Sequence, residues 1–153
     1  MTKTLISRFL AGLLLAVTAG CGSSPSGPAE IATIRATTSF GFCVGYCRTT
    51  LEIAPQQAVL IKEPLHSTLP TRRVTTPLTA AEWAALVEAV DRKRLESLPE
   101  VLGCPDCADG GAESLEVVGA GWQRKVTFEF GRDVAAVQPL LDRVRTLRQR
   151  LDP

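Results

Sequence analysis

Two pairs of closely spaced cysteines are the residues of this chain with the clearest capacity for chemistry. Cys43 and Cys47 are separated by three residues, and Cys104 and Cys107 form a C-x-x-C motif. Four such thiols can form disulfides, bind one metal ion as thiolates, or exchange electrons as a reactive dithiol. The compartment of the protein and the elements around each pair decide between these chemistries.

The N-terminus predicts export and a lipid anchor. Lys3 and Arg8 accompany an apolar run over residues 9–17, which is shorter than the roughly 20 residues of a membrane span and is typical of a signal peptide. The Thr-Ala-Gly-Cys sequence that ends at Cys21 resembles the lipobox of bacterial lipoproteins. The resemblance implies that residues 1–20 are removed and that Cys21 becomes the lipidated first residue.

The rest of the chain predicts a single tethered domain. Residues 21–30 contain the lipidated cysteine and a stretch rich in Gly, Ser and Pro, which is typical of a flexible tether. Residues 31–153 are long enough for one hydrophobic core. Gly22 resembles the residue of lipoproteins sorted to the outer membrane, so we expect a cell-envelope protein anchored there and facing the periplasm.

The charge of the chain argues against a nucleic-acid partner. The full sequence has 17 Lys+Arg and 16 Asp+Glu, and loss of Lys3 and Arg8 with the signal peptide leaves 15 against 16. Such a near-neutral balance lacks the basic excess of nucleic-acid-binding domains. The expected partners are the membrane, through the lipid on Cys21, and an envelope protein or a small ligand.

Hydrophobic patterning predicts an α+β domain, with a mainly antiparallel sheet of five to six strands and two helices, stapled by cysteines. β-favouring or alternating runs predict strands near residues 31–40, 49–53, 58–61, 72–75, 114–118 and 122–130. Thr79-Ala80-Ala81-Glu82 fits a capping box that begins a helix, with Trp83 as a core anchor. That helix is expected to continue so that Arg92, Lys93 and Arg94 lie in its last turns.

A second helix is expected from Ala136 to Leu151, with Pro139 in its first turn. Its apolar stripe comprises Val137, Leu140, Leu141, Val144, Leu147 and Leu151. Its polar side carries Arg143, Arg145, Arg148 and Arg150. These arginines predict either a solvated helix face or a contact with anionic lipid headgroups.

An oxidising compartment favours disulfides for Cys43, Cys47, Cys104 and Cys107. Four cysteines allow three pairings, and the sequence leaves the choice open. A local bridge within each pair would contribute roughly 2 kcal/mol and a bridge between the two loops roughly 4 kcal/mol. The magnitude favours bridges between the loops, but it does not decide the geometry.

Thiol redox catalysis and zinc binding are the alternatives for the same four cysteines. In thiol–disulfide oxidoreductases the C-x-x-C motif follows a strand and opens a helix, whereas here it follows a predicted helix and leads through Gly110-Gly111 into a strand. Four thiolates could also bind structural zinc, although an oxidising compartment disfavours free thiols. Asp106 and Asp109 lack the spacing of a calcium loop and are expected to form a turn.

No catalytic constellation is evident, so we expect no enzymatic activity, no cofactor and no metal. His66 is the only histidine and lies in a predicted surface loop. Glu113 and Glu116 are the nearest approach to a pair of carboxylates, but nothing marks them as an acid–base pair.

Three motifs together resemble a set of uncharacterised bacterial lipoproteins. They are residues 42–47 (FCVGYC), residues 78–83 (LTAAEW) and residues 104–111 (CPDCADGG). The resemblance spans most of the mature domain and implies no mechanism, because the family has no established activity. The expected role is binding or scaffolding in the cell envelope.

Overall fold

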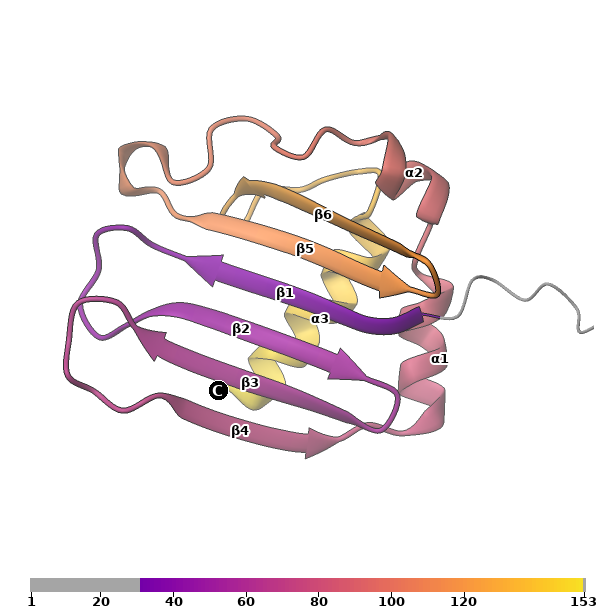
Figure 1. The fold of residues 1–153 in the computed structure, drawn as a ribbon, viewed down its shortest axis with the longest axis horizontal. Coiled ribbons are helices and arrows are strands. Elements are labelled where there is room, and N and C mark those ends of the chain that lie inside the picture. Colours follow the sequence, from indigo (N-terminus) through magenta and orange to yellow (C-terminus); the bar gives the residue numbers. More distant parts are fainter. Residues whose placement is uncertain (1–30, 153) are drawn as a thin grey trace, which may run out of the picture.

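The computed structural model describes residues 31–152, which form one six-stranded antiparallel sheet with helices on one face (Figure 1). The strands are β1 Ile31–Ser39, β2 Tyr46–Ala54, β3 Gln57–Pro64, β4 Arg72–Pro77, β5 Ala112–Gly119 and β6 Trp122–Glu129, in the order β4-β3-β2-β1-β5-β6. The helices are α1 Ala80–Glu88, α2 Arg92–Ser97 and α3 Gln138–Leu151, with a 3₁₀ turn η1 at Cys107–Asp109. The predicted α+β class is confirmed.

Buried and more exposed side chains alternate along the strands, so the sheet has one buried face and one open face. In β1, Ile34 and Ala36 are buried, whereas Arg35 and Thr37 point to the opposite side. The register places Ile34 beside Ile53 of β2 and beside Val117 of β5, so the apolar positions of neighbouring strands form one layer. α1 and α3 cover this layer, as they do behind the sheet in Figure 1.

Strand β1 lies in the middle of the sheet because it pairs with β2 on one side and with β5 on the other. The β1–β5 pairing joins segments that are about 80 residues apart in the chain, which local patterns do not reveal. At the end of β1, Ser39 pairs with both Arg48 and Ala112. The loops that follow β1 and precede β5, each containing one cysteine pair, therefore lie at the same end of the sheet.

The capping box at α1 is confirmed, but the predicted length of that helix is wrong. The Thr79 hydroxyl accepts a hydrogen bond from the backbone N–H of Glu82, and the Glu82 carboxylate accepts one from the backbone N–H of Thr79. The helix ends at Glu88, and the side chain of Asp91 caps a new helix by accepting from the Arg94 N–H at 3.0 Å. The predicted C-terminal cations instead occupy the first half of α2, because this second cap interrupts the helix.

Helix α3 has the apolar stripe that its sequence predicts. It begins at Gln138 rather than Ala136, with Pro139 in its first turn, where a missing N–H is tolerated. The predicted apolar residues of the stripe are all buried: Val137, Leu140, Leu141, Val144, Leu147 and Leu151. Within residues 31–152, no helix combines the length and the hydropathy required to cross a bilayer.

A short segment covers the outer edge of β6. Thr127 of β6 donates its N–H to the Glu100 carbonyl at 2.8 Å, and its own carbonyl accepts from the Leu102 N–H at 2.9 Å. Val101 between them makes a parallel bridge with Thr127. The main-chain groups at this edge of the sheet are therefore partly satisfied.

Candidate interaction surface at the disulfide end of the sheet

Both cysteine pairs form local disulfides. Cys43 is bonded to Cys47, with Cα atoms 5.7 Å apart, and Cys104 is bonded to Cys107, with Cα atoms 5.5 Å apart. The cysteines do not form bridges between the two loops, although such bridges would give the larger stabilisation. Each bond instead closes a small loop at the end of the sheet where β1 ends and β5 begins.

The surroundings of Cys104 and Cys107 differ from those of a redox-active dithiol. Cys107 begins the three-residue turn η1, which leads to β5, and no α-helix starts at the motif. The helix N-terminus that lowers the pKa of a catalytic thiol is thus missing from this loop. All four sulfur atoms are in disulfide bonds, so they do not form a set of four thiolate ligands.

Asp106 joins the two disulfide loops without a covalent bond. Its carboxylate accepts from the Gly41 N–H at 3.1 Å, across the gap to the β1–β2 loop, and from the Gly111 N–H at 3.1 Å within its own loop. The Asp106 backbone has φ of 61°, in the left-handed region, which aspartate tolerates better than most residues. Asp106 therefore does more than form the expected turn, because its side chain also holds one loop against the other.

Gly111 must be glycine at the base of this loop. Its φ is 82°, and a Cβ atom there would lie 2.3 Å from the ring of Phe40. The Phe40 ring in turn packs edge-on against Phe130, with ring centroids 4.9 Å apart. The Gly111 carbonyl accepts from the N–H groups of Asp106 and Phe130.

A charged contact fixes the beginning of the Cys104–Cys107 loop to the end of β6. The Glu129 carboxylate accepts from the Cys104 N–H at 2.9 Å and pairs with the Arg132 guanidinium at 2.7 Å. The hydrogen bonds from Arg132 and from the Cys104 N–H lower the pKa of Glu129 to about 2. The carboxylate therefore stays ionised and keeps this contact at any pH above that value.

The β3–β4 loop lies against the Cys43–Cys47 loop. Nε2 of His66 is 3.1 Å from the Gly41 carbonyl oxygen, and the Tyr46 hydroxyl donates to the Pro70 carbonyl at 2.9 Å. His66 is exposed, as expected for a surface residue. Together with the hydrogen bond between Asp106 and Gly41, these two contacts bring three loops together at this end of the sheet.

Large apolar side chains are exposed on these loops. Phe42 is 83% exposed and Val44 is fully exposed, and both flank Cys43. We define the apolar tip as Phe42, Val44, Leu65, Leu69 and Phe130, which account for five of the seven large hydrophobic residues exposed within residues 31–152. All five belong to the end of the sheet that carries the disulfide loops, which makes this end the candidate for an interaction site.

The apolar tip lies at the end of the sheet opposite Ile31. Ile31 pairs with Gly119, whereas the other end of the same strand, Ser39, pairs with Ala112 beside the disulfide loops. The nine residues of β1 separate these ends by about 30 Å, given the rise of a strand. In Figure 1, β1 begins at the right side of the sheet and the three loops lie at the left.

The open face of the sheet is polar and its central charges are mutually paired. Arg35 pairs with Glu116 at 2.7 Å and with Glu52 at 3.2 Å, and the hydroxyls of Thr37 and Thr50 lie 3.2 Å apart. Four of these residues, Arg35, Thr37, Thr50 and Glu52, line a shallow hollow of about 570 Å³. The pairing explains how a sheet can leave this face uncovered in water.

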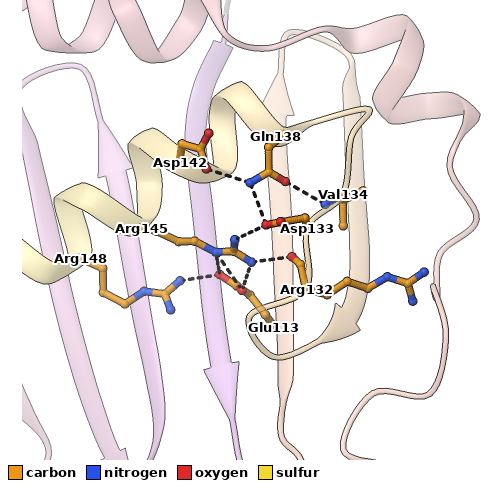
Figure 2. A network of polar contacts seen from close by, with 8 residues as sticks. All are labelled: Glu113, Arg132, Asp133, Val134, Gln138, Asp142, Arg145 and Arg148. Atoms are coloured by element: carbon orange, nitrogen blue, oxygen red, sulfur yellow. Dashed lines mark hydrogen bonds and ion pairs between the residues drawn. The ribbon is translucent and has the colours of Figure 1, made fainter.

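On the other face, Glu113 fixes α3 to the sheet (Figure 2). Its carboxylate is 1% exposed and accepts from Arg145 at 2.8 Å and from Arg148 at 3.1 Å. The hydrogen bond to Glu113 raises the pKa of Arg145. The same guanidinium donates to the Arg132 carbonyl at 2.7 Å and lies 3.5 Å from Asp133. This network connects β5, α3 and the loop between β6 and α3.

The network corrects the interpretation of a solvated helix face for two of the four arginines on α3, Arg145 and Arg148. Arg145 and Arg148 turn toward Glu113, and Arg150 pairs with Glu82 of α1 at 2.6 Å. Arg143 is exposed. The sequence missed these contacts because their acidic partners lie on other elements of the chain.

Glu113 and Glu116 do not form a carboxylate pair. They are three residues apart on β5, so their side chains lie on opposite faces of the sheet. Glu113 contacts α3, whereas Glu116 contacts Arg35 and Gln123 on the open face.

Sequence reasoning found the cysteines of this surface but not its apolar tip. The signal for part of the tip was present, since Phe42 and Val44 flank Cys43 within a loop. The exposure of Leu65, Leu69 and Phe130 had no such signal. The predicted lipidation site, Cys21, lies outside the described residues.

No protein-family model matches this chain, and no curated protein matches it either. The chemistry of the surface itself is therefore the basis for a functional proposal.

Proposed function

We propose that this protein is a membrane-tethered binding module of the cell envelope, and that its apolar tip contacts a partner protein. The observation that carries the proposal is the exposure of Phe42 and Val44 on a loop closed by the Cys43–Cys47 disulfide. An aromatic side chain on a constrained loop gains contact area with little loss of conformational entropy on binding. Large aromatic residues are also the usual anchors of protein–protein contacts.

The position of the tip supports a partner away from the anchored membrane. The tether predicted over residues 22–30 would join the domain at Ile31, at the opposite end of β1. A domain held by that end presents the disulfide loops toward the periplasm. The hydrogen bonds of Asp106 to Gly41 and Gly111 keep these loops in one arrangement.

Site-specific photo-crosslinking in intact cells tests this proposal. A photoreactive phenylalanine analogue replaces Phe42 in one variant and Ala120 in the control, because Ala120 is exposed in the turn between β5 and β6, at the opposite end of the sheet. We expect an adduct of defined mass from position 42 and none from position 120. A charge introduced at the tip by Val44→Asp should reduce the yield of this adduct about tenfold or more.

The proposal is wrong if position 42 gives no adduct, or if its adducts are lipids. It is also wrong if Val44→Asp leaves the yield unchanged in a protein that is still folded. A double variant, Cys43→Ser with Cys47→Ser, should weaken crosslinking because the loop is no longer constrained before binding.

A further inference from the structure

The outer edge of β4 is unpaired within residues 31–152. β4, Arg72–Pro77, pairs only with β3 and forms one edge of the sheet. The opposite edge, at β6, is covered by residues 100–102 through hydrogen bonds to Thr127. One edge of the sheet is thus partly covered, whereas the other presents free main-chain groups.

The register identifies the groups that point away from β3. The Leu78 N–H, directly after β4, donates to the Gln56 carbonyl at 3.0 Å. In an antiparallel pair, successive residues point their N–H and C=O groups alternately toward the partner and away from it. Counting back from Leu78, Val74 and Thr76 face β3, and the main-chain groups of Arg73 and Thr75 face outward.

Pro77 fits this assignment. It has no N–H, and by the same alternation it occupies an outward-facing position of β4. Proline is tolerated in a sheet where the missing N–H would face solvent. The edge available to another strand therefore consists of the N–H and C=O groups of Arg73 and Thr75, together with the C=O group of Pro77.

The charge on this edge selects the kind of strand that could pair with it. Arg72 and Arg73 are both exposed, and neither makes an ion pair among the residues that the structure describes. β4 contains no acidic residue. A second copy pairing through β4 would place four arginines along one seam, which is unfavourable, whereas acidic side chains would pair with them.

We propose that the outer edge of β4 accepts an extended acidic segment of a partner protein as an additional strand. Main-chain hydrogen bonds to Arg73 and Thr75 would provide the pairing, and the two arginines would provide the preference for acidic side chains. This contact is separate from the one proposed at the apolar tip and does not depend on it.

Hydrogen–deuterium exchange of the full-length protein in detergent tests the proposal at single-residue resolution. The probes are two short capped peptides, one with a pair of adjacent glutamates between valines and the other with lysines at the same positions, because Arg72 and Arg73 point to opposite faces of the sheet. The acidic peptide should slow exchange at the Arg73 and Thr75 amides about tenfold. The basic peptide should not change these rates, and Val74 and Thr76 should be protected in both cases.

Variants distinguish the contribution of main-chain hydrogen bonds to peptide binding from the contribution of charge. Thr75→Pro removes an outward N–H at a position equivalent to that of Pro77, so it should abolish the effect of the peptide, whereas Thr75→Ala keeps the N–H and should preserve it. Arg72→Glu with Arg73→Glu should reverse the preference between the peptides. Arg143→Glu, on the exposed side of α3, is the matched control and should leave the preference unchanged.

Three results would overturn the proposal. The first is unchanged exchange of Arg73 and Thr75 at millimolar acidic peptide, and the second is equal protection by both peptides. The third is protection of these amides without peptide in a dimeric protein, which would show that a second copy occupies the edge. If Thr75→Pro does not fold, the double arginine variant decides between these outcomes.

Discussion

Glu113 shows how a single buried carboxylate can position an entire helix. Its side chain rises from β5 into the layer between the sheet and α3, where Arg145 and Arg148 meet it. The sequence offered no reason to connect residues so far apart. The carboxylate and the two guanidinium groups come together only because α3 packs across β5. This packing depends on the apolar stripe of the helix.

Replacing this carboxylate should destabilise the domain. Glu113→Gln leaves two guanidinium groups, 22% and 14% exposed, with a neutral acceptor in place of an ion. We expect a loss of about 2 kcal/mol in the free energy of unfolding, which is below the range for a fully buried pair because water reaches both guanidinium groups.

Urea denaturation measures this change. Glu88→Gln, on the exposed surface of α1, is the control and should change the free energy of unfolding by less than about 0.5 kcal/mol. Equal effects of the two substitutions would show that the Glu113 network does not contribute to stability.

At the scale of elements, α1 and α3 are connected by the pair of Glu82 and Arg150. The Glu82 carboxylate also accepts from the backbone N–H and the hydroxyl of Thr79, so one side chain both caps α1 and contacts α3. The hydrogen bond from Arg150, followed by those from Thr79, lowers the pKa of Glu82 from 4.5 to about 2.

This lowered pKa predicts a pH dependence with a defined sign. Between pH 4.5 and about 2, the unfolded chain binds a proton at Glu82 while the folded protein does not. Stability therefore rises with pH in this window, and the contribution of Glu82 is complete above it and lost as pH falls through about 2. Glu82→Gln should reduce this slope.

Denaturation midpoints measured at several pH values across that window check the prediction. Glu88→Gln serves again as the control and should follow the wild-type slope. The prediction fails if Glu82→Gln retains the full pH dependence, since Glu129, whose pKa is also about 2, would then account for it.

Elements with local signals were predictable, and their pairings were not. The capping box of α1 and the stripe of α3 were evident because helix caps and helical periodicity involve residues within a few positions of one another. The end of α1 was missed because the cap at Asp91 competes with continued helix. The pairing of β1 with β5, which places both disulfide loops together, depends on tertiary contacts that no local pattern encodes.

At the scale of the whole molecule, the two ends of the sheet have different roles in the proposal. Ile31 marks the end that the predicted tether would join, and Phe42 and Val44 mark the end that is proposed to bind. The length of β1 keeps these ends apart. The free edge of β4 begins directly after the loop that carries Leu65 and Leu69, so the two proposed contact surfaces adjoin each other.

The proposed anchor predicts the cellular distribution of the protein. Cys21→Ser removes the sulfur that would carry the lipid, so the protein should move from the membrane fraction to the soluble fraction after cell lysis. Gly22→Asp leaves Cys21 in place and should stay with membranes. Immunoblots of both fractions measure this. Membrane association of the Cys21→Ser variant would contradict the lipid anchor.

The sequence by itself determined the class of the domain, most of its elements and the presence of two cysteine loops, because these follow from periodicity, caps and composition over short stretches. Only the tertiary structure decided how the cysteines pair. The sequence left three pairings open; each bond forms within its own pair, and the Asp106 carboxylate, rather than a disulfide, makes the contact between the loops. It likewise decided that Phe42 and Val44 face solvent, since exposure depends on what the rest of the fold leaves uncovered.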